Sequence, residues 1–140
     1  MSESKLSAEE IVKQKMFNSD AFSKWMGIRI ISVSEGSCVL KMVVTNDMLN
    51  GFGIAHGGIT FSLADSALAF ASNSHGQKAV SIETSISHTC QVKLGDELTA
   101  SATELHCSHR IGNYQVSIVN QNQETVAIFK GVVYRKTELW

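Results

Sequence analysis

The chain of 140 residues contains no proline and three cysteines, and neither sign of charge is in clear excess. Without proline, its turns must depend on glycine, asparagine and aspartate. Cys38, Cys90 and Cys107 are odd in number and widely spaced, so no disulfide framework is expected. The net charge of −1 gives no reason to expect nucleic acid or an anionic membrane surface as a partner.

Long apolar runs are also missing. None approaches the ~20 residues that a transmembrane helix requires, and the polar N-terminus MSESKLSAEE lacks the apolar core of a secretory signal. We therefore expect a cytoplasmic protein with no membrane partner. With 44% hydrophobic and 18% charged residues, the chain is expected to form one soluble domain over residues 1–140.

Two short helices are expected in residues 1–27. Ser7 and Glu10 fit a capping box that precedes a helical pattern, and Asp20 caps a second helix that Gly27 ends. Both are expected to pack on the outside of the domain as structural helices. The alternative is a lid over a pocket, whose apolar wall would consist of Phe22, Trp25 and Met26.

The strands are expected at residues 28–34, 37–45, 79–89, 97–109, 114–120 and 125–136. The first two are joined by a tight turn at Glu35 and Gly36, and short turns between consecutive strands predict an antiparallel sheet. Gly131 inside the last strand indicates a bulge or a close backbone approach.

Residues 48–73 form the centre of the chain. A glycine-rich turn leads into a helix that begins near residues 56–58, ends near residues 73–76 and is apolar on nearly every side. Such a helix must be buried, so the sheet is expected to wrap it. Because one sheet cannot enclose it fully, a second subunit is expected to supply the remaining cover.

The glycines of this segment suit a site at a helix N-terminus. They nearly match the dinucleotide fingerprint, but no alternation of parallel strands and helices follows, so that interpretation is rejected. At Gly57 and Gly58, free backbone N–H groups could stabilise an oxyanion on a carbonyl or thioester. The alternative is that both glycines only permit a tight turn.

Asp65 is the one carboxylate in the helix, and an isolated buried carboxylate is costly. It follows Gly57 by eight residues, which separates the two by ~12 Å along one helix. If both serve one reaction, they must come from different subunits. Alternatively, Asp65 is a structural carboxylate bonded to Ser62, Ser66 or a neighbouring backbone group.

Asn50 and His56 flank the glycines, as candidate site residues or as simple turn and cap residues.

His106, Cys107 and His109 resemble a metal cluster, but His106 and Cys107 should point to opposite faces of a strand. No metal site is therefore expected.

The motif formed by Asn50, the run His56-Gly57-Gly58 and Asp65 resembles that of the hot-dog-fold acyl-coenzyme A thioesterases, in particular the PaaI-type branch of phenylacetic acid degradation. The resemblance covers about 130 residues in matching order. It implies an α+β fold, in which an antiparallel sheet of about five to six strands wraps a long helix. It also implies dimers that form tetramers, with acyl-coenzyme A sites at the dimer interface and no separate cofactor.

The resemblance also implies roles for individual residues. Asp65 would be the general base or nucleophile, and the Gly57 amide would polarise the thioester carbonyl of a substrate held against the other chain. Asn50 and His56 would belong to the same pocket. The expected substrate-binding residues are Gly58, Ser81, Phe61, Lys93 and Arg110.

Members of the family that this chain resembles often carry a basic residue and a proline after the third strand, near the coenzyme A entrance. Here residues 88–93 contain neither a proline nor an arginine. Lys93, or Arg110 from elsewhere in the chain, is expected to hold the nucleotide phosphates instead. The implied acyl group is phenylacetyl, hydroxyphenylacetyl or a similar aryl or medium-chain group. A hydratase or dehydratase of the same fold and a non-catalytic acyl-coenzyme A sensor are the alternatives. The first would need a histidine near Asp65, whereas His56 lies nine residues away.

Overall fold

The computed structural model describes residues 4–140, so the first three residues of the expected N-terminal region lie outside it. The chain begins with a π-helical segment, η1 (Glu10–Met16), a 3₁₀ turn, η2 (Phe17–Ser19), and helix α1 (Ala21–Trp25). Ser7 and Glu10 form the expected capping box, since each side chain bonds the backbone N–H of the other. Asp20 accepts the N–H of Ser23 and caps α1.

A six-stranded antiparallel sheet follows, in the order β1-β2-β4-β5-β6-β3. The predicted number of about five to six strands is confirmed, and their bounds differ from the expected ones by a few residues. The strands are β1 (Arg29–Ser34), β2 (Ser37–Val43), β3 (Gln77–His88), β4 (Glu97–Cys107), β5 (Ile111–Val119) and β6 (Thr125–Leu139).

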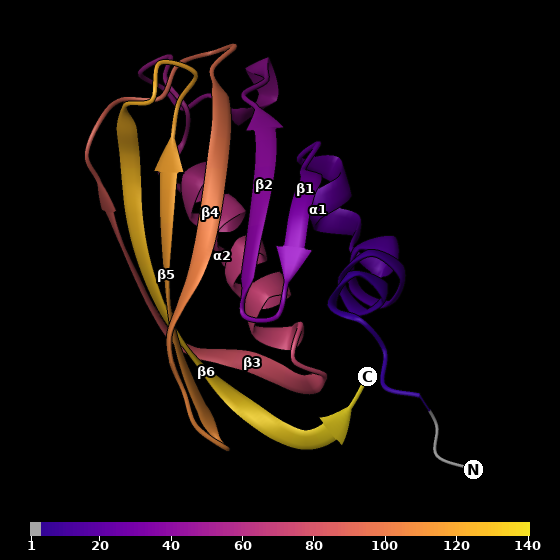
Figure 1. Cartoon of the computed structure of the whole chain (residues 1–140). Coiled ribbons are helices and arrows are strands. Elements are labelled where there is room, and N and C mark those ends of the chain that lie inside the picture. Colours follow the sequence, from indigo (N-terminus) through magenta and orange to yellow (C-terminus); the bar gives the residue numbers. More distant parts are fainter. Residues whose placement is uncertain (1–3) are drawn as a thin grey trace.

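Helix α2 (Gly57–Asn73) is the central element, and Figure 1 shows the sheet curving around it while α1 lies beside β1. A short 3₁₀ turn, η3 (Asn46–Met48), precedes it. The residues of α2 that face the sheet are fully buried, among them Leu63, Ala67 and Leu68. Gly131 on β6 is neither a bulge nor a contact with another backbone: it makes room for a side chain, because a Cβ there would lie 2.5 Å from Cδ2 of Leu68.

Strand β3 forms one edge of the sheet and is irregular. The register shifts twice along its pairing with β6, once between Gln77 and Ala79 and once between Ser81 and Glu83. Val80 and Ile82 remain 47% and 59% exposed in the single chain. An edge strand with exposed apolar side chains is a ready surface for pairing with another strand.

Within residues 4–140, no helix has both the length and the apolar character needed to cross a bilayer.

Candidate active site

The N-terminus of α2 presents one free backbone amide. His56 is the N-cap, and its Nδ1 accepts the N–H of Gly58 at 2.9 Å. This bond requires the neutral tautomer of His56 with the proton on Nε2. The N–H of Gly57 has no acceptor among residues 4–140. Of the two glycines, therefore, Gly57 is the one that can donate to a ligand, aided by the positive end of the helix dipole.

A cavity of about 410 Å³ opens beside this amide. It is formed by the loop before α2, the first turn of α2 and the segment that follows β3. Its lining residues are Asn50, Ile54, Ala55, Gly57, Thr60, His88, Thr89, Cys90, Gln91 and Val92.

Asn50 builds the loop on one side of this cavity. Its Oδ1 accepts the N–H of Phe52 at 2.9 Å and that of Ile54 at 3.4 Å. Asn50 therefore does stabilise the turn, and this role occupies its side-chain oxygen. The Nδ2 group has no acceptor within the described part of the chain, so it remains able to donate to a carbonyl or a water.

His88 is a site residue that the sequence analysis did not identify. Its Nδ1 lies 3.2 Å from Oγ1 of Thr60, and its Nε2 would lie 3.3 Å from a Cβ placed on Gly57. The imidazole therefore stands next to the free amide. His88 is the last residue of β3 and lies 31 positions beyond Gly57 in the sequence, so no local spacing relates the two residues.

Asp65 lies two turns further along α2 and is half-buried. Burial raises the pKa of its carboxyl group above the usual value. Neither Ser62 nor Ser66 bonds to it, since the Ser66 hydroxyl is paired with Ser23 at 2.8 Å. Across residues 4–140 the carboxylate has no hydrogen-bond or ion-pair partner, which leaves the structural alternative without support within one chain.

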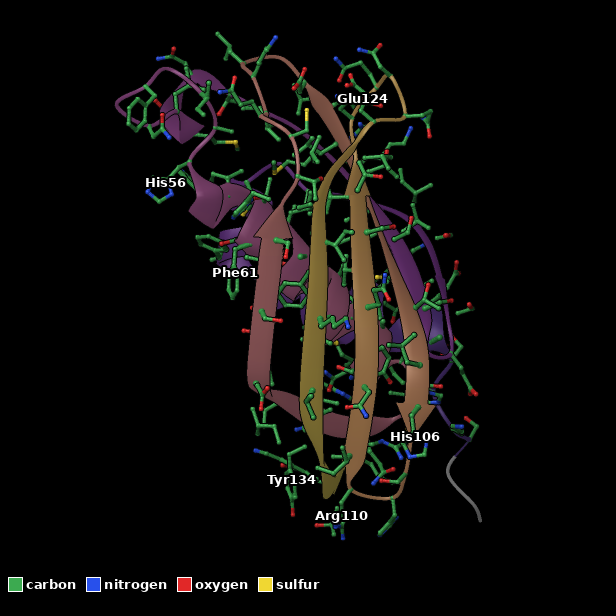
Figure 2. The ribbon with its side chains drawn as sticks, turned by 90° about the vertical axis from the view of Figure 1, so that its left-hand side faces the viewer. His56, Phe61, His106, Arg110, Glu124 and Tyr134 are labelled. Atoms are coloured by element: carbon green, nitrogen blue, oxygen red, sulfur yellow. The ribbon has the colours of Figure 1, made fainter. Side chains whose placement is uncertain are left out.

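Gly57 and Asp65 thus offer a donor and a carboxylate that do not meet in one chain. Their separation along α2 is ~12 Å, because an α-helix rises about 1.5 Å per residue. Phe61 lies between them and packs edge-to-face on Phe129, with ring centroids 5.5 Å apart. Figure 2 shows Phe61 on the same side of the molecule as His56. Ser81 is exposed on the edge strand β3.

The two expected phosphate-binding residues occupy different places. Lys93 is exposed and lines a second cleft that shares Cys90 and Gln91 with the first cavity. Arg110 lies at the opposite end of the sheet from His56, as Figure 2 shows, and donates to the carbonyl of Arg135 at 3.2 Å. Of the two residues, therefore, Lys93 is the one that lines a cleft adjoining the cavity beside the free amide.

The N-terminal helices reach the other side of the α2 N-terminus. Phe22 and Trp25, 53% and 60% exposed, line a cavity of about 330 Å³ together with His56, Gly58 and neighbouring residues. Their rings lie 5.9 Å apart. Met26 is not part of this wall, because it is buried in the core. The lid interpretation therefore has a structural basis for two of its three residues.

The chain belongs to the thioesterase superfamily, whose sequence profile matches residues 52–127. It is similar to the acyl-coenzyme A thioesterase PaaI of Escherichia coli (strain K12), with 47% identity over 86% of this chain and 86% of that protein.

Two solved structures have the same fold. That of the E. coli PaaI protein from the phenylacetic acid degradation operon has a TM-score of 0.89 and 44% identity, covering 91% of this chain and 92% of its own. The structure of a hypothetical thioesterase from Streptococcus pneumoniae TIGR4, solved with coenzyme A, has a TM-score of 0.84 and 28% identity. The match covers 90% of this chain and 98% of that chain. The predicted hot-dog fold and thioester hydrolase class are confirmed.

Proposed function

We propose that this protein hydrolyses acyl-coenzyme A thioesters at a site that two copies of the chain build together. One observation carries the proposal: the free amide of Gly57 and the unpaired carboxylate of Asp65 lie ~12 Å apart on one helix. A thioester carbonyl cannot contact both. It can do so when two α2 helices lie side by side, so that Asp65 faces Gly57 of the partner subunit.

The chemistry of the two groups is complementary. The Gly57 amide, at the positive end of α2, donates to the carbonyl oxygen as negative charge develops there. Asp65 either removes a proton from the attacking water or attacks the carbonyl carbon itself, forming an anhydride that water then opens. In both routes the carbon–sulfur bond breaks and a carbon–oxygen bond forms. The products are the free acid and coenzyme A as its thiol, and no cofactor takes part.

The neighbouring side chains have supporting roles in this proposal. The Nδ2 group of Asn50 is available to orient the water or the carbonyl, while its oxygen holds the loop. His56 fixes the Gly58 amide and so leaves Gly57 as the donor. Lys93, exposed beside the cavity, would bind the phosphates of coenzyme A in this proposal. Within one chain Arg110 lies at the opposite end of the sheet from His56, so it would serve this task only from the partner subunit.

The edge strand β3 supports the dimer. Its unpaired backbone groups and the exposed Val80 and Ile82 would be covered if the β3 strands of two copies paired. Ser81 on the same strand would then lie near the interface. A tetramer of two such dimers and a cytoplasmic location remain predictions from the sequence.

The acyl group we propose is phenylacetyl, hydroxyphenylacetyl or a similar aryl or medium-chain group. Phe61 lies between the two catalytic groups and offers an aromatic wall, although its packing on Phe129 also gives it a structural role. The likeness to PaaI of E. coli, from a phenylacetic acid degradation operon, supports an aryl substrate.

The test offers purified protein aryl-acetyl, benzoyl and fatty acyl-coenzyme A esters and follows thiol release. Turnover is expected, and Asp65→Asn should lower the rate by about 10²–10⁴, the usual contribution of a positioned base. Glu9→Gln, at an exposed carboxylate on the N-terminal segment, is the matched control and should keep full activity. Binding of the esters without turnover would instead favour an acyl-coenzyme A sensor, and hydration of an enoyl ester would favour a hydratase.

A further inference from the structure

Three side chains with metal-binding atoms meet beyond the C-terminus of α2, away from the proposed active site. They are His75, Glu104 and Cys107, and one ligand atom of each lies within 4.8 Å of the others. His75 follows the end of α2, whereas Glu104 and Cys107 belong to β4. Nε2 of His75 lies 2.7 Å from Oε1 of Glu104. This cluster differs from the one considered in the sequence, because His106 and His109 are exposed and do not join it.

A β-bulge makes the cluster possible. In a regular strand, residues three apart point to opposite faces. Here Glu104 pairs with Tyr114 and Cys107 with Gly112, so Leu105 is an extra residue without a partner on β5. Since Tyr114 and Gly112 are two apart, they share a face, and the bulge places Glu104 and Cys107 on that same face. Bulges of this kind often re-aim side chains next to functional sites.

The surroundings hold the three side chains in place. The hydroxyl of Tyr114 donates to Oε1 of Glu104 at 2.6 Å, which orients the carboxylate as an outer hydrogen-bond partner does in many metal sites. Nδ1 of His75 lies 3.9 Å from a second carboxylate, that of Glu35, which is beyond hydrogen-bond distance. Opposite Cys107, Gly112 has no side chain, and a Cβ there would lie 2.8 Å from Tyr114.

The donor set matches a particular kind of ion. Imidazole nitrogen, carboxylate oxygen and thiolate sulfur are the three ligand types of Zn²⁺, at distances of about 2.0–2.3 Å. Tetrahedral geometry at these lengths separates ligand atoms by roughly 3.3–3.8 Å, so shifts of about 1 Å would complete the site. The side chains of His75 and Glu104 are 22% and 26% exposed, which leaves the site open to an ion from solvent.

We propose that His75, Glu104 and Cys107 bind a divalent transition-metal ion, with Zn²⁺ as the best match and a water in the fourth position. Binding replaces the proton of the Cys107 thiol and the contact between His75 and Glu104 with three bonds to the ion. The ion would fasten the end of α2 to β4 and, through Tyr114, to β5.

The site is separate from the hydrolysis proposed above. The 17 residues of α2 place its two ends about 25 Å apart, so an ion beyond Asn73 cannot touch a substrate held at Gly57 of the same chain. In Figure 2, His106, the neighbour of Cys107, lies at the opposite end of the sheet from His56. The ion is therefore expected to act on stability, and hydrolysis is not expected to require it within one chain.

The experiment titrates chelator-treated, reduced full-length protein with ZnCl₂ by calorimetry and with CoCl₂ by absorption spectroscopy. We expect one ion per chain and, with cobalt, a thiolate charge-transfer band in the near ultraviolet. Cys107→Ser should abolish this band, and His75→Gln and Glu104→Gln should each weaken binding at least tenfold. The matched controls Cys90→Ser and His106→Asn remove an exposed thiol and an exposed imidazole that the cluster does not use.

Circular dichroism of each variant without metal shows whether it folds. Binding that survives both Cys107→Ser and His75→Gln, or binding that either control abolishes, would overturn the proposal. So would the absence of binding to the folded wild-type protein. None of these outcomes depends on whether the protein hydrolyses acyl-coenzyme A, because the readout is the ion itself.

Discussion

Gly57→Pro is the substitution that isolates the amide proposed to stabilise the oxyanion. Proline removes the N–H while leaving the helix intact, because Gly57 is the first residue of α2, where proline is favoured. The preceding residue, His56, already has φ −60° and ψ 136°, the extended conformation that proline requires before it. Loss of one oxyanion donor is expected to lower kcat by about 10²–10³, or about 2.7–4 kcal/mol.

Gly57→Ala separates loss of the donor from steric crowding. Alanine keeps the N–H, but its Cβ would lie 3.3 Å from Nε2 of His88, a tight contact that a small rotation of the exposed imidazole can relieve. The alanine variant should therefore retain much more activity than the proline variant. Equal losses in the two would show that space, and not the amide, limits the reaction.

Mixing two inactive variants then tests whether the site is shared between chains. In a random mixture of Asp65→Asn and Gly57→Pro chains, half of the dimers contain one chain of each kind. If each site takes Asp65 from one chain and Gly57 from the other, every mixed dimer has one intact site and one site with both defects. About one quarter of the wild-type activity should return, because one of two sites works in half of the dimers.

The assay co-expresses the two variants in equal amounts, verifies mixed dimers by native mass spectrometry and measures thiol release per chain. Each variant expressed alone provides the baseline. If both groups acted within one chain, every site in the mixture would carry a defect and the activity would stay at that baseline. Mixed dimers without recovered activity would therefore refute the shared site.

Three further predictions concern stability and substrate choice. Asp65→Asn should stabilise the protein at pH 7, because burial raises the pKa of the Asp65 carboxyl and so makes its ionised form costly in the folded chain. Wild-type stability should fall as pH rises from the unfolded-state pKa through the raised folded-state pKa, and urea unfolding of the variant should lack this fall. Gly131→Ala should lower the free energy of unfolding, measured in urea, by about 1–3 kcal/mol. In a chain that already carries Leu68→Ala, the same substitution should change this free energy little. Trp25→Ala should raise KM for aryl esters severalfold at nearly constant kcat, and an unchanged KM would contradict a role for Trp25 as a lid.

Much of the fold followed from signals that act over a few residues. The capping box at Ser7, the cap at Asp20 and the turn at Gly36 are local, because each depends on hydrogen bonds or backbone angles within one turn. The apolar character of residues 57–73 likewise required a buried helix. The separation of Gly57 and Asp65 also came from the sequence, since it depends only on the rise of an α-helix.

Other features depended on contacts between distant segments, which periodicity does not encode. The position of β3 at the edge beside β6 brings His88 against Gly57 across 31 positions of sequence. The one-residue bulge at Leu105 reverses the faces expected for the end of β4 and so unites Glu104 with Cys107. A register shift of one residue changes which side chains meet, and long-range strand pairing alone decides where it occurs. The sequence by itself thus determined the helices and the separation of the two candidate catalytic groups, while the tertiary structure decided which side chains surround them.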